Sequence, residues 1–167
     1  MRFTLVDRIV ELEAGVRIKA LKNLSMAEEY LEDHFPGFPV MPGVLMLESM
    51  TQAAAWLIRA GEDFAHSMVV LGEARNVKYG NFVEPGRVLT IEAEIQSQDE
   101  RRTTLKAWGH VDGEPTVAGR LTLEQYNLSE DDPTRSDADA VIVQRLREQF
   151  AQIYRQQPTP RQSPAGD

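Results

Sequence analysis

The chain has 167 residues, of which 42% are hydrophobic, and this suffices for one buried core with little left for a second domain. Its 18 basic residues against 26 acidic ones give a formal net charge of −8, which argues against nucleic acid as a partner, because phosphate backbones attract basic surfaces. The absence of cysteine excludes a disulfide framework, thiolate metal sites and a cysteine nucleophile.

The chain carries no recognisable export or membrane signal. Its first eight residues, MRFTLVDR, contain no apolar signal core, and no run of about 18 uncharged apolar residues follows. The sequence therefore predicts a cytoplasmic protein without a membrane span.

The first elements are a hairpin and a short helix. Between residues 5 and 23, apolar and polar residues alternate on both sides of Ala14-Gly15, which predicts a β-hairpin. Ser25 is followed three residues later by Glu28, a capping-box pattern typical of a helix start. Three prolines and two glycines between residues 36 and 43 then predict a stiff irregular loop.

A long apolar helix and a series of strands follow. Residues 44–60 favour a helix that is apolar almost all round, so other structure must enclose it. Strand patterns occupy residues 67–78, 88–96, 103–111 and 117–123, with turn signals at Pro85-Gly86 and Asp112-Gly113. We expect an α+β fold in which this helix lies on one face of a curled sheet of five to six mostly antiparallel strands.

The composition changes after residue 128, so residues 1–128 are expected to form the domain. Residues 129–140, with five acidic residues and one arginine, predict an acidic solvated linker. Apolar residues at helical spacing predict an amphipathic helix over 141–157, which would pack on the domain or on a partner subunit. Residues 158–167 are rich in Pro, Ser and Gly and are predicted to be disordered.

Glu48 is the first candidate for chemistry. It is the only acidic residue between His34 and Glu62, and it lies on the apolar helix. A carboxylate there loses hydration and needs hydrogen-bond donors. Gln52, one turn further on the same face, can donate its amide. These residues alone fit either a structural network or a catalytic acid.

Two neighbouring features could complete a reaction site. His34 immediately precedes the proline-rich loop, and a general base needs such a rigid mounting. Pro42 and Gly43 open the helix, whose first amide N–H groups can face negative charge developing on an oxygen. A base, an acid and an oxyanion donor together are the groups needed to remove a proton beside a carbonyl with loss of a leaving group. Taken separately, His34 also fits an exposed structural histidine, and Pro42-Gly43 also fits an ordinary helix start.

The segment from His34 to Gln52 closely resembles the signature of the β-hydroxyacyl-acyl-carrier-protein dehydratases of the FabZ type. That signature reads H-F-P-G-x-P-V-M-P-G-V-L, two variable positions, and E-A/S-M-x-Q, and every fixed position matches. A looser resemblance includes LVDR at 5–8, VKY at 77–79 and VDG at 111–113, so that it covers about residues 3–125. The resemblance implies the hot-dog fold, in agreement with a helix enclosed by a sheet.

The resemblance also implies roles and a reaction. His34 would be the catalytic base and Glu48 the acid, contributed by opposite subunits of a homodimer to one tunnel. Gly43 would offer its amide to the thioester carbonyl, Val40 would accept a hydrogen bond from the far nitrogen of His34, and Gln52 would hold the Glu48 carboxyl. The implied reaction converts (3R)-3-hydroxyacyl thioesters on acyl carrier protein to trans-2-enoyl thioesters, in fatty acid or related acyl-chain synthesis and without a cofactor. Glu at position 48, where a sister branch has Asp, favours dehydration without isomerisation of the double bond.

Two sets of residues are candidates for substrate and carrier contacts. Apolar side chains in and after the signature would line the acyl tunnel, although such residues are more often core: Phe38, Met41, Met46, Met50 and Trp56. Acyl carrier protein is acidic, so docking on this acidic chain requires a local basic patch. Its candidate members are Arg75, Lys78, Arg101 and Arg102. His66 and His110 have no convergent partners in the sequence and are expected to be exposed.

The chain departs from the family pattern in loops near the expected tunnel mouth. Asp33 replaces the usual Gly before His34, so the loop or the pH optimum is expected to differ from the family. Near the tunnel mouth, Arg87 replaces an acidic residue and GNF at 80–82 replaces a more basic stretch. Chain-length preference or carrier docking is therefore expected to differ from the family.

Two other functions stay open at this point. One is a hot-dog acyl thioesterase, in which a carboxylate activates water, and the other is a non-catalytic acyl-binding or assembly subunit with the C-terminal helix as its docking element. A homodimer is expected in each case, because one domain leaves an edge strand and a helix flank uncovered. A trimer of dimers is common in the family.

Overall fold

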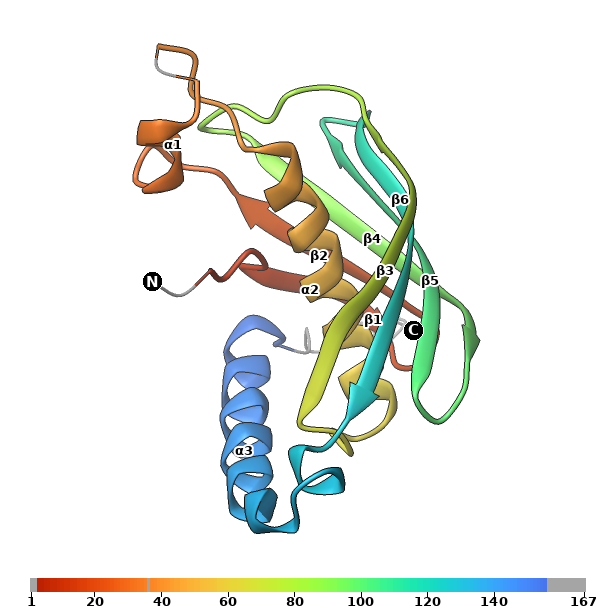
Figure 1. The fold of residues 1–167 in the computed structure, drawn as a ribbon. Helices are drawn as coiled ribbons and strands as arrows, with labels where there is room; N and C mark the ends of the chain where they lie inside the picture. Colours follow the sequence, from red (N-terminus) through yellow and green to blue (C-terminus); the bar gives the residue numbers. More distant parts are fainter. Residues whose placement is uncertain (1–2, 36, 156–167) are drawn as a thin grey trace, which may run out of the picture.

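In the computed structural model, which describes residues 3–35 and 37–155, a single sheet curls around helix α2 (Figure 1). The helices are α1 (Tyr30–Asp33), α2 (Gly43–Gly61) and α3 (Ser136–Ile153), with 3-10 turns η1 (Leu128–Glu130) and η2 (Pro133–Arg135). The strands are β1 (Arg8–Glu13), β2 (Arg17–Asn23), β3 (Met68–Tyr79), β4 (Val88–Gln98), β5 (Arg102–Val111) and β6 (Glu114–Tyr126). The predicted α+β arrangement is confirmed.

The sheet has the order β1-β2-β4-β5-β6-β3, and all neighbouring strands are antiparallel. Strand β3 is therefore an edge strand, although it directly follows α2 in the chain. The opposite edge, β1, receives one bridge from the chain after α3, between Ile9 and Tyr154. None of the helices in the described residues combines the length and hydropathy that a bilayer crossing requires.

Helix α2 fills the concave face of the sheet because it is apolar on nearly every side. Its small residues Ala53 and Ala54 are fully buried and allow the helix to approach the strands closely. The strands alternate, so that every second residue points at the helix. These inward residues are Ile18, Ala20, Leu89, Ile91, Ala93, Leu105, Ala107, Leu121 and Leu123. This packing fixes which helix positions stay free to form a site.

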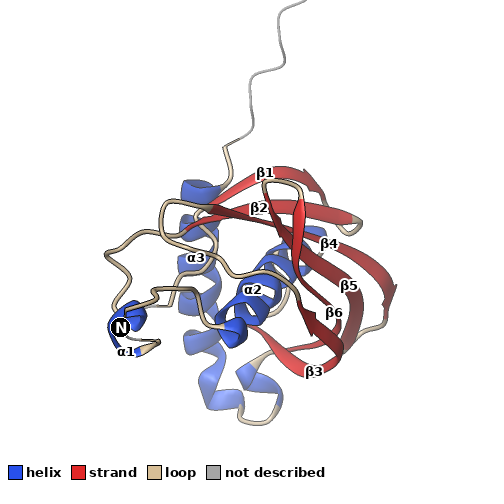
Figure 2. Ribbon diagram, turned by 90° about the horizontal axis from the view of Figure 1, so that it is seen from above, coloured by secondary structure: helices blue, strands red, loops and turns tan. Residues whose placement is uncertain are grey.

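Helix α3 covers part of the side of α2 that faces away from β4 and β5 (Figures 1 and 2). Phe150 on α3 packs its ring against Trp56 and Phe64, with centroid separations of 5.9 and 5.5 Å. The helix begins at Ser136, five residues before its predicted start at 141, and ends at Ile153. The tail predicted over 158–167 lies outside the described residues.

The early start of α3 is explained by Asp139, which the sequence placed in a solvated linker. Its carboxylate is buried and accepts hydrogen bonds from the Ser67 hydroxyl and from the backbone N–H groups of Leu128 and Ser129, both at 2.9 Å. Burial raises the pKa of Asp139, but the hydrogen bonds from Ser129, Ser67 and Leu128 lower it by more, so the pKa lies well below its usual range. The segment over 129–140 is thus an anchored connection, which corrects the predicted linker.

We expect Asp139→Asn to lower the melting temperature at pH 7 by several degrees and to speed hydrogen exchange in α3. Because the pKa of Asp139 is depressed in the folded protein, its carboxylate stabilises the fold above its unfolded pKa of about 4 and loses that effect as the pH falls below it. The difference between variant and parent should therefore shrink below about pH 4. Asp137→Asn, in the same turn but exposed, is the matched control. Equal melting temperatures of Asp139→Asn and the parent at pH 7 would show that this carboxylate does not hold α3.

Candidate active site

His34 is held at the end of α1. It caps that helix with an extended backbone, and its half-buried ring lies 4.4 Å from the ring of Phe35 between centroids. Phe35 has a φ of 52°, a left-handed conformation that is uncommon for residues other than glycine. The chain therefore turns sharply after the histidine, in a backbone conformation that costs free energy and is typical of functional sites.

An ion-pair cluster ties the approach to α1 to the sheet. Lys22 on β2 is only 4% exposed, and its Nζ lies 2.6 Å from Glu28 Oε1 and 3.6 Å from Asp7 Oδ2. A buried ammonium group needs such carboxylates, because it has lost its hydration. The cluster thus fixes the segment that leads into α1 and His34.

The start of α2 presents free backbone donors. Pro42 is the N-cap, and its carbonyl oxygen accepts hydrogen bonds from the amides of Leu45 (2.9 Å) and Met46 (3.2 Å). The N–H groups of Gly43 and Val44 precede the first helical hydrogen bond and lie at the positive end of the helix dipole. A Cβ at position 43 would lie 3.1 Å from Tyr79 Cε1, so glycine lets the Tyr79 ring lie close against the helix start.

Glu48 is oriented by Gln52 on the next turn. Gln52 Nε2 donates to Glu48 Oε1 (2.9 Å) and to the Phe3 carbonyl (3.0 Å), while its Oε1 accepts from the Leu5 amide (2.9 Å). Because the N-terminal segment binds both ends of the amide group, the Gln52 side chain cannot turn away from the carboxylate. Oε1 of Glu48 is thereby occupied, and its second oxygen is left for another partner.

Glu48 and Gln52 line a pocket of about 480 Å³ between α2, β3, α3 and the N-terminal segment. Its wall also contains residues 3–4, residues 69–71, two residues of α3 and four more residues of α2, namely Thr51, Ala55, Trp56 and Arg59. His34 is not among the lining residues, so the predicted base and acid do not share this pocket in a single chain. Within the part of the chain that the structure describes, no hydrogen bond joins His34 to Val40, whose side chain is buried.

The five tunnel candidates separate into three groups. Trp56 lines the pocket of Glu48. Met41, Met46 and Met50 are at most 3% exposed and belong to the core. Phe38 is 48% exposed and packs edge-on against Phe82, with their centroids 5.6 Å apart. Trp56 is the one candidate that lines this pocket, and the acyl tunnel shared by two subunits stays a prediction.

The four basic candidates do not form one patch. Arg102 on β5 pairs with Glu124 of β6, whereas Lys78 on β3 pairs with Ala118 of β6. Ala118 and Glu124 are six residues apart on one strand, so the two basic residues are about 20 Å apart along the sheet. Three of the four also have carboxylate partners, namely Glu73 for Arg75, Glu130 for Arg101 and Glu124 for Arg102. Lys78 and Arg102 are therefore far apart along the sheet, with Arg75 opposite Arg120 between them, and carrier docking stays a prediction.

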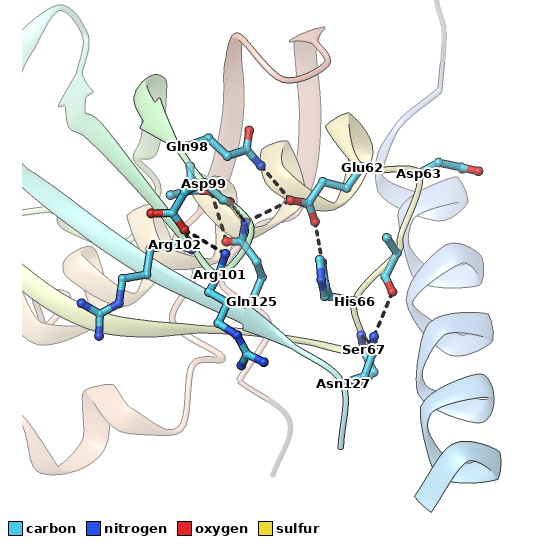
Figure 3. Close-up of polar contacts among 12 residues, drawn as sticks. Glu62, Asp63, His66, Ser67, Gln98, Asp99, Arg101, Arg102, Gln125 and Asn127 are labelled. Atoms are coloured by element: carbon cyan, nitrogen blue, oxygen red, sulfur yellow. Dashed lines mark hydrogen bonds and ion pairs between the residues drawn. The ribbon is translucent and has the colours of Figure 1, made fainter. Parts of the chain in front are cut away.

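Both remaining histidines have partners, contrary to the sequence prediction. His66 Nδ1 lies 2.8 Å from Glu62 Oε2, and Glu62 Oε1 accepts hydrogen bonds from Gln98 (2.7 Å) and Gln125 (3.0 Å) (Figure 3). His110 Nε2 lies 3.1 Å from Glu92 Oε1. The four-residue spacing of Glu62 and His66 at the helix end was a signal for the first pair, whereas the second depends on strand register.

The family model of the FabA-like domain matches residues 1–122. The chain belongs to the FabA-like family. Its curated relatives include the 3-hydroxyacyl-acyl-carrier-protein dehydratase FabZ of Ruminiclostridium cellulolyticum, which is 40% identical over 119 residues that cover 71% of this chain and 84% of the relative. The FabZ of Wolbachia pipientis is 43% identical over 95 residues, 57% of this chain and 66% of the relative. The resemblance seen in the signature is thus confirmed.

Two solved structures share the fold of this chain. The dehydratase heterocomplex ApeI:P from Xenorhabdus doucetiae superposes with a TM-score of 0.65 at 22% identity, over 80% of this chain and 90% of that one. The acetyl-CoA-bound protein smu.793 from Streptococcus mutans has a TM-score of 0.56 at 12% identity, over 75% and 91% of the two chains. The fold of this FabA-like chain is the hot-dog fold.

Proposed function

We propose that this protein is a 3-hydroxyacyl-acyl-carrier-protein dehydratase of the FabZ type, acting in fatty acid or related acyl-chain synthesis. The observation that carries the proposal is Glu48, a carboxylate held by Gln52 at the wall of a pocket on the central helix of a FabA-like domain. The names of the FabZ relatives support the same reaction. The predicted cytoplasmic location is part of this proposal.

The proposed reaction is an elimination of water. His34 takes a proton from C2 of the (3R)-3-hydroxyacyl thioester, and the electron pair of that C–H bond forms the C2–C3 double bond. The Gly43 amide donates to the thioester oxygen, on which negative charge grows. The C3–O bond breaks as Glu48 protonates the 3-hydroxyl group, and water leaves. The thioester makes C2 acidic enough for a histidine, so the chain's own groups supply each step.

A homodimer would complete the site. His34 does not line the pocket of Glu48 in one chain, β3 has a free sheet edge within the described residues, and large apolar side chains are exposed at the end of β3, in the loop after it and at the start of α2. Tyr79, Phe82 and Val44 are 50%, 62% and 68% exposed. A second copy paired along β3 would cover this surface and bring the base of one subunit to the acid of the other.

Product analysis tests the reaction itself. We expect the purified protein to convert a carrier-bound 3-hydroxyacyl thioester to a product with enoyl absorbance and to release no free thiol. Release of thiol without enoyl absorbance would identify a thioesterase. Neither signal with several acyl lengths would favour a non-catalytic acyl-binding subunit.

Carrier docking is proposed at Lys78, on the strand that also places Tyr79 over Gly43. An acidic carrier would meet this positive side chain close to the start of α2. We expect Lys78→Glu to raise KM for carrier-bound substrate several-fold but to leave KM for a small thioester unchanged. Arg101→Glu makes the same change in net charge at the other end of the strands and should raise neither. Equal effects of the two variants would exclude local docking at Lys78.

A further inference from the structure

Arg59 lies on the same face of α2 as Glu48 and lines the same pocket. The step of eleven residues is close to three helical turns, so the two Cα atoms are about 16 Å apart along the helix axis. Trp56 lies between them on this face. The pocket therefore extends from the proposed acid to a guanidinium group.

The guanidinium of Arg59 lacks the partners that such a group needs. Its Nε is buried without a hydrogen-bond partner, and Nη2 reaches only the Val69 carbonyl at 3.5 Å. Its Cζ lies 5.3 Å from the centroid of the Trp56 ring. Burial lowers the pKa of Arg59 to about 10, so the group is still charged at neutral pH. The side chain as a whole is partly buried, and a charge that has lost part of its hydration is costly without a counter-ion such as a carboxylate or phosphate.

The exposed arginines of this chain are in a different position. Seven of them have a carboxylate within ion-pair distance, namely Arg17, Arg75, Arg87, Arg101, Arg102, Arg135 and Arg147. Four other exposed arginines have none among the described residues, but water can solvate their charge: Arg8, Arg120, Arg145 and Arg155. No carboxylate of the described residues lies within ion-pair distance of Arg59, whose charge is partly buried and faces a pocket. An anionic ligand would supply the missing partner.

Helix α3 contributes to the wall of this pocket. Leu146 and Gln149 both line it, so α3 narrows the space beside Arg59 and adds one amide group to it. Val69, Val70 and Leu71 of β3 supply an apolar wall. The lining thus combines apolar sides with a cation, which suits an alkyl chain that ends in an acidic group.

We infer that Arg59 binds the remote end of the acyl chain and selects substrates that end in a carboxylate over those that end in a methyl group. This inference rests on the proposed function, because it assumes that C3 of the substrate lies at Glu48. A guanidinium fork matches a carboxylate with two parallel hydrogen bonds. A methyl group at the end of the chain would leave the Arg59 charge unpaired and would displace the water that hydrates it. The site therefore discriminates against methyl-ended substrates.

The separation along α2 sets the expected length. C–C bonds of about 1.5 Å advance an extended chain by about 1.3 Å each, so about twelve bonds span the distance between the two Cα atoms. The long arginine side chain reduces the span to be filled. Acyl chains of about eight to twelve carbons are therefore expected to place their terminal carboxylate at Arg59.

Matched substrates test the inference. Pairs of 3-hydroxyacyl pantetheine thioesters of equal length, ending in carboxylate or methyl, are compared with the full-length protein. For the parent we expect kcat/KM to be at least about tenfold higher with the carboxylate end. Arg59→Met should abolish that preference by lowering kcat/KM for the carboxylate-ended substrate while leaving kcat/KM for the methyl-ended one unchanged. Arg59→Lys should keep part of the preference. Arg145→Met, an exposed arginine of α3, is the control and should keep the full preference.

The melting temperature separates a ligand site from a structural one. Methionine fills a similar volume without charge, so Arg59→Met should melt at the same or a higher temperature than the parent. A parent without preference between the two ends would overturn the inference. So would an Arg59→Met variant that loses activity equally on both substrates and melts at a lower temperature, because Arg59 would then serve the fold.

A second measurement is independent of catalysis. Saturated acyl pantetheine thioesters lack the 3-hydroxyl group and cannot be dehydrated, so calorimetry reports binding alone. Tighter binding of the carboxylate-ended thioester by the parent, lost in Arg59→Met, would support the inference even if no dehydration is found and the proposed function fails. Equal binding of both thioesters would overturn it whether or not the protein is a dehydratase.

Discussion

Glu48→Gln is expected to lower kcat by about 10²–10⁴-fold, the range that a general acid contributes. The amide cannot protonate the departing hydroxyl group, but its oxygen can still accept the hydrogen bond that Gln52 gives to Glu48 Oε1 at 2.9 Å. The contact to Gln52 and the N-terminal segment therefore stays, and the melting temperature should not fall. Enoyl absorbance with saturating substrate measures the loss.

A matched change elsewhere controls for charge and side-chain chemistry. Glu92→Gln removes a partly buried carboxylate on β4 that contacts His110, away from the pocket, and should keep the parent's kcat. If Glu48→Gln turned over substrate at the parent rate, Glu48 would not be the acid. Its hydrogen bond to Gln52 would then be structural.

His34→Ala should lose activity by a comparable factor, and mixing it with Glu48→Gln tests how the site is assembled. If base and acid come from opposite subunits, a heterodimer of the two variants has one site with both wild-type residues and one with neither. Such heterodimers, isolated through two different affinity tags, should show about half the activity of the parent dimer. Each variant alone should stay inactive.

Assembly within one subunit gives the opposite result. Every site of the heterodimer would then carry one of the two substitutions, and mixing would restore nothing. The absence of recovery in heterodimers of confirmed composition would exclude the shared site. Because His34 does not line the pocket of Glu48 in one chain, we expect recovery.

The elements of the domain could be predicted because their patterns are local. Residues 44–60 indicated a buried helix, which extends over Gly43–Gly61, and the strand expected at 88–96 extends over Val88–Gln98. The contact between Gln52 and Glu48 was equally accessible, since residues four apart share a helix face. Strand order was not accessible in this way, because no local pattern places β3 beside β6.

Features that depend on distant contacts escaped the sequence. Ser67 and Asp139 are 72 residues apart in the chain, so no local pattern shows their hydrogen bond. The acidic composition around Asp139 therefore predicted a solvated segment, whereas the structure has a buried, hydrogen-bonded carboxylate. The pocket that Arg59 lines has part of its wall from α3, which the sequence presented as an appendage. Basic residues were grouped by charge alone, whereas their positions along β3, β5 and β6 separate them.

The position of β3 in the sheet has a consequence for synthesis on the ribosome. Its only strand partner in the described residues is β6, and the first pair, Met68 with Tyr126, is separated by more than fifty residues of chain. During translation β3 therefore emerges with both backbone edges unpaired and must wait until nearly all of the domain has left the exit tunnel. Nascent chains stalled between β3 and β6 should be prone to aggregate and to recruit chaperones, because an unpaired strand readily joins a neighbouring chain.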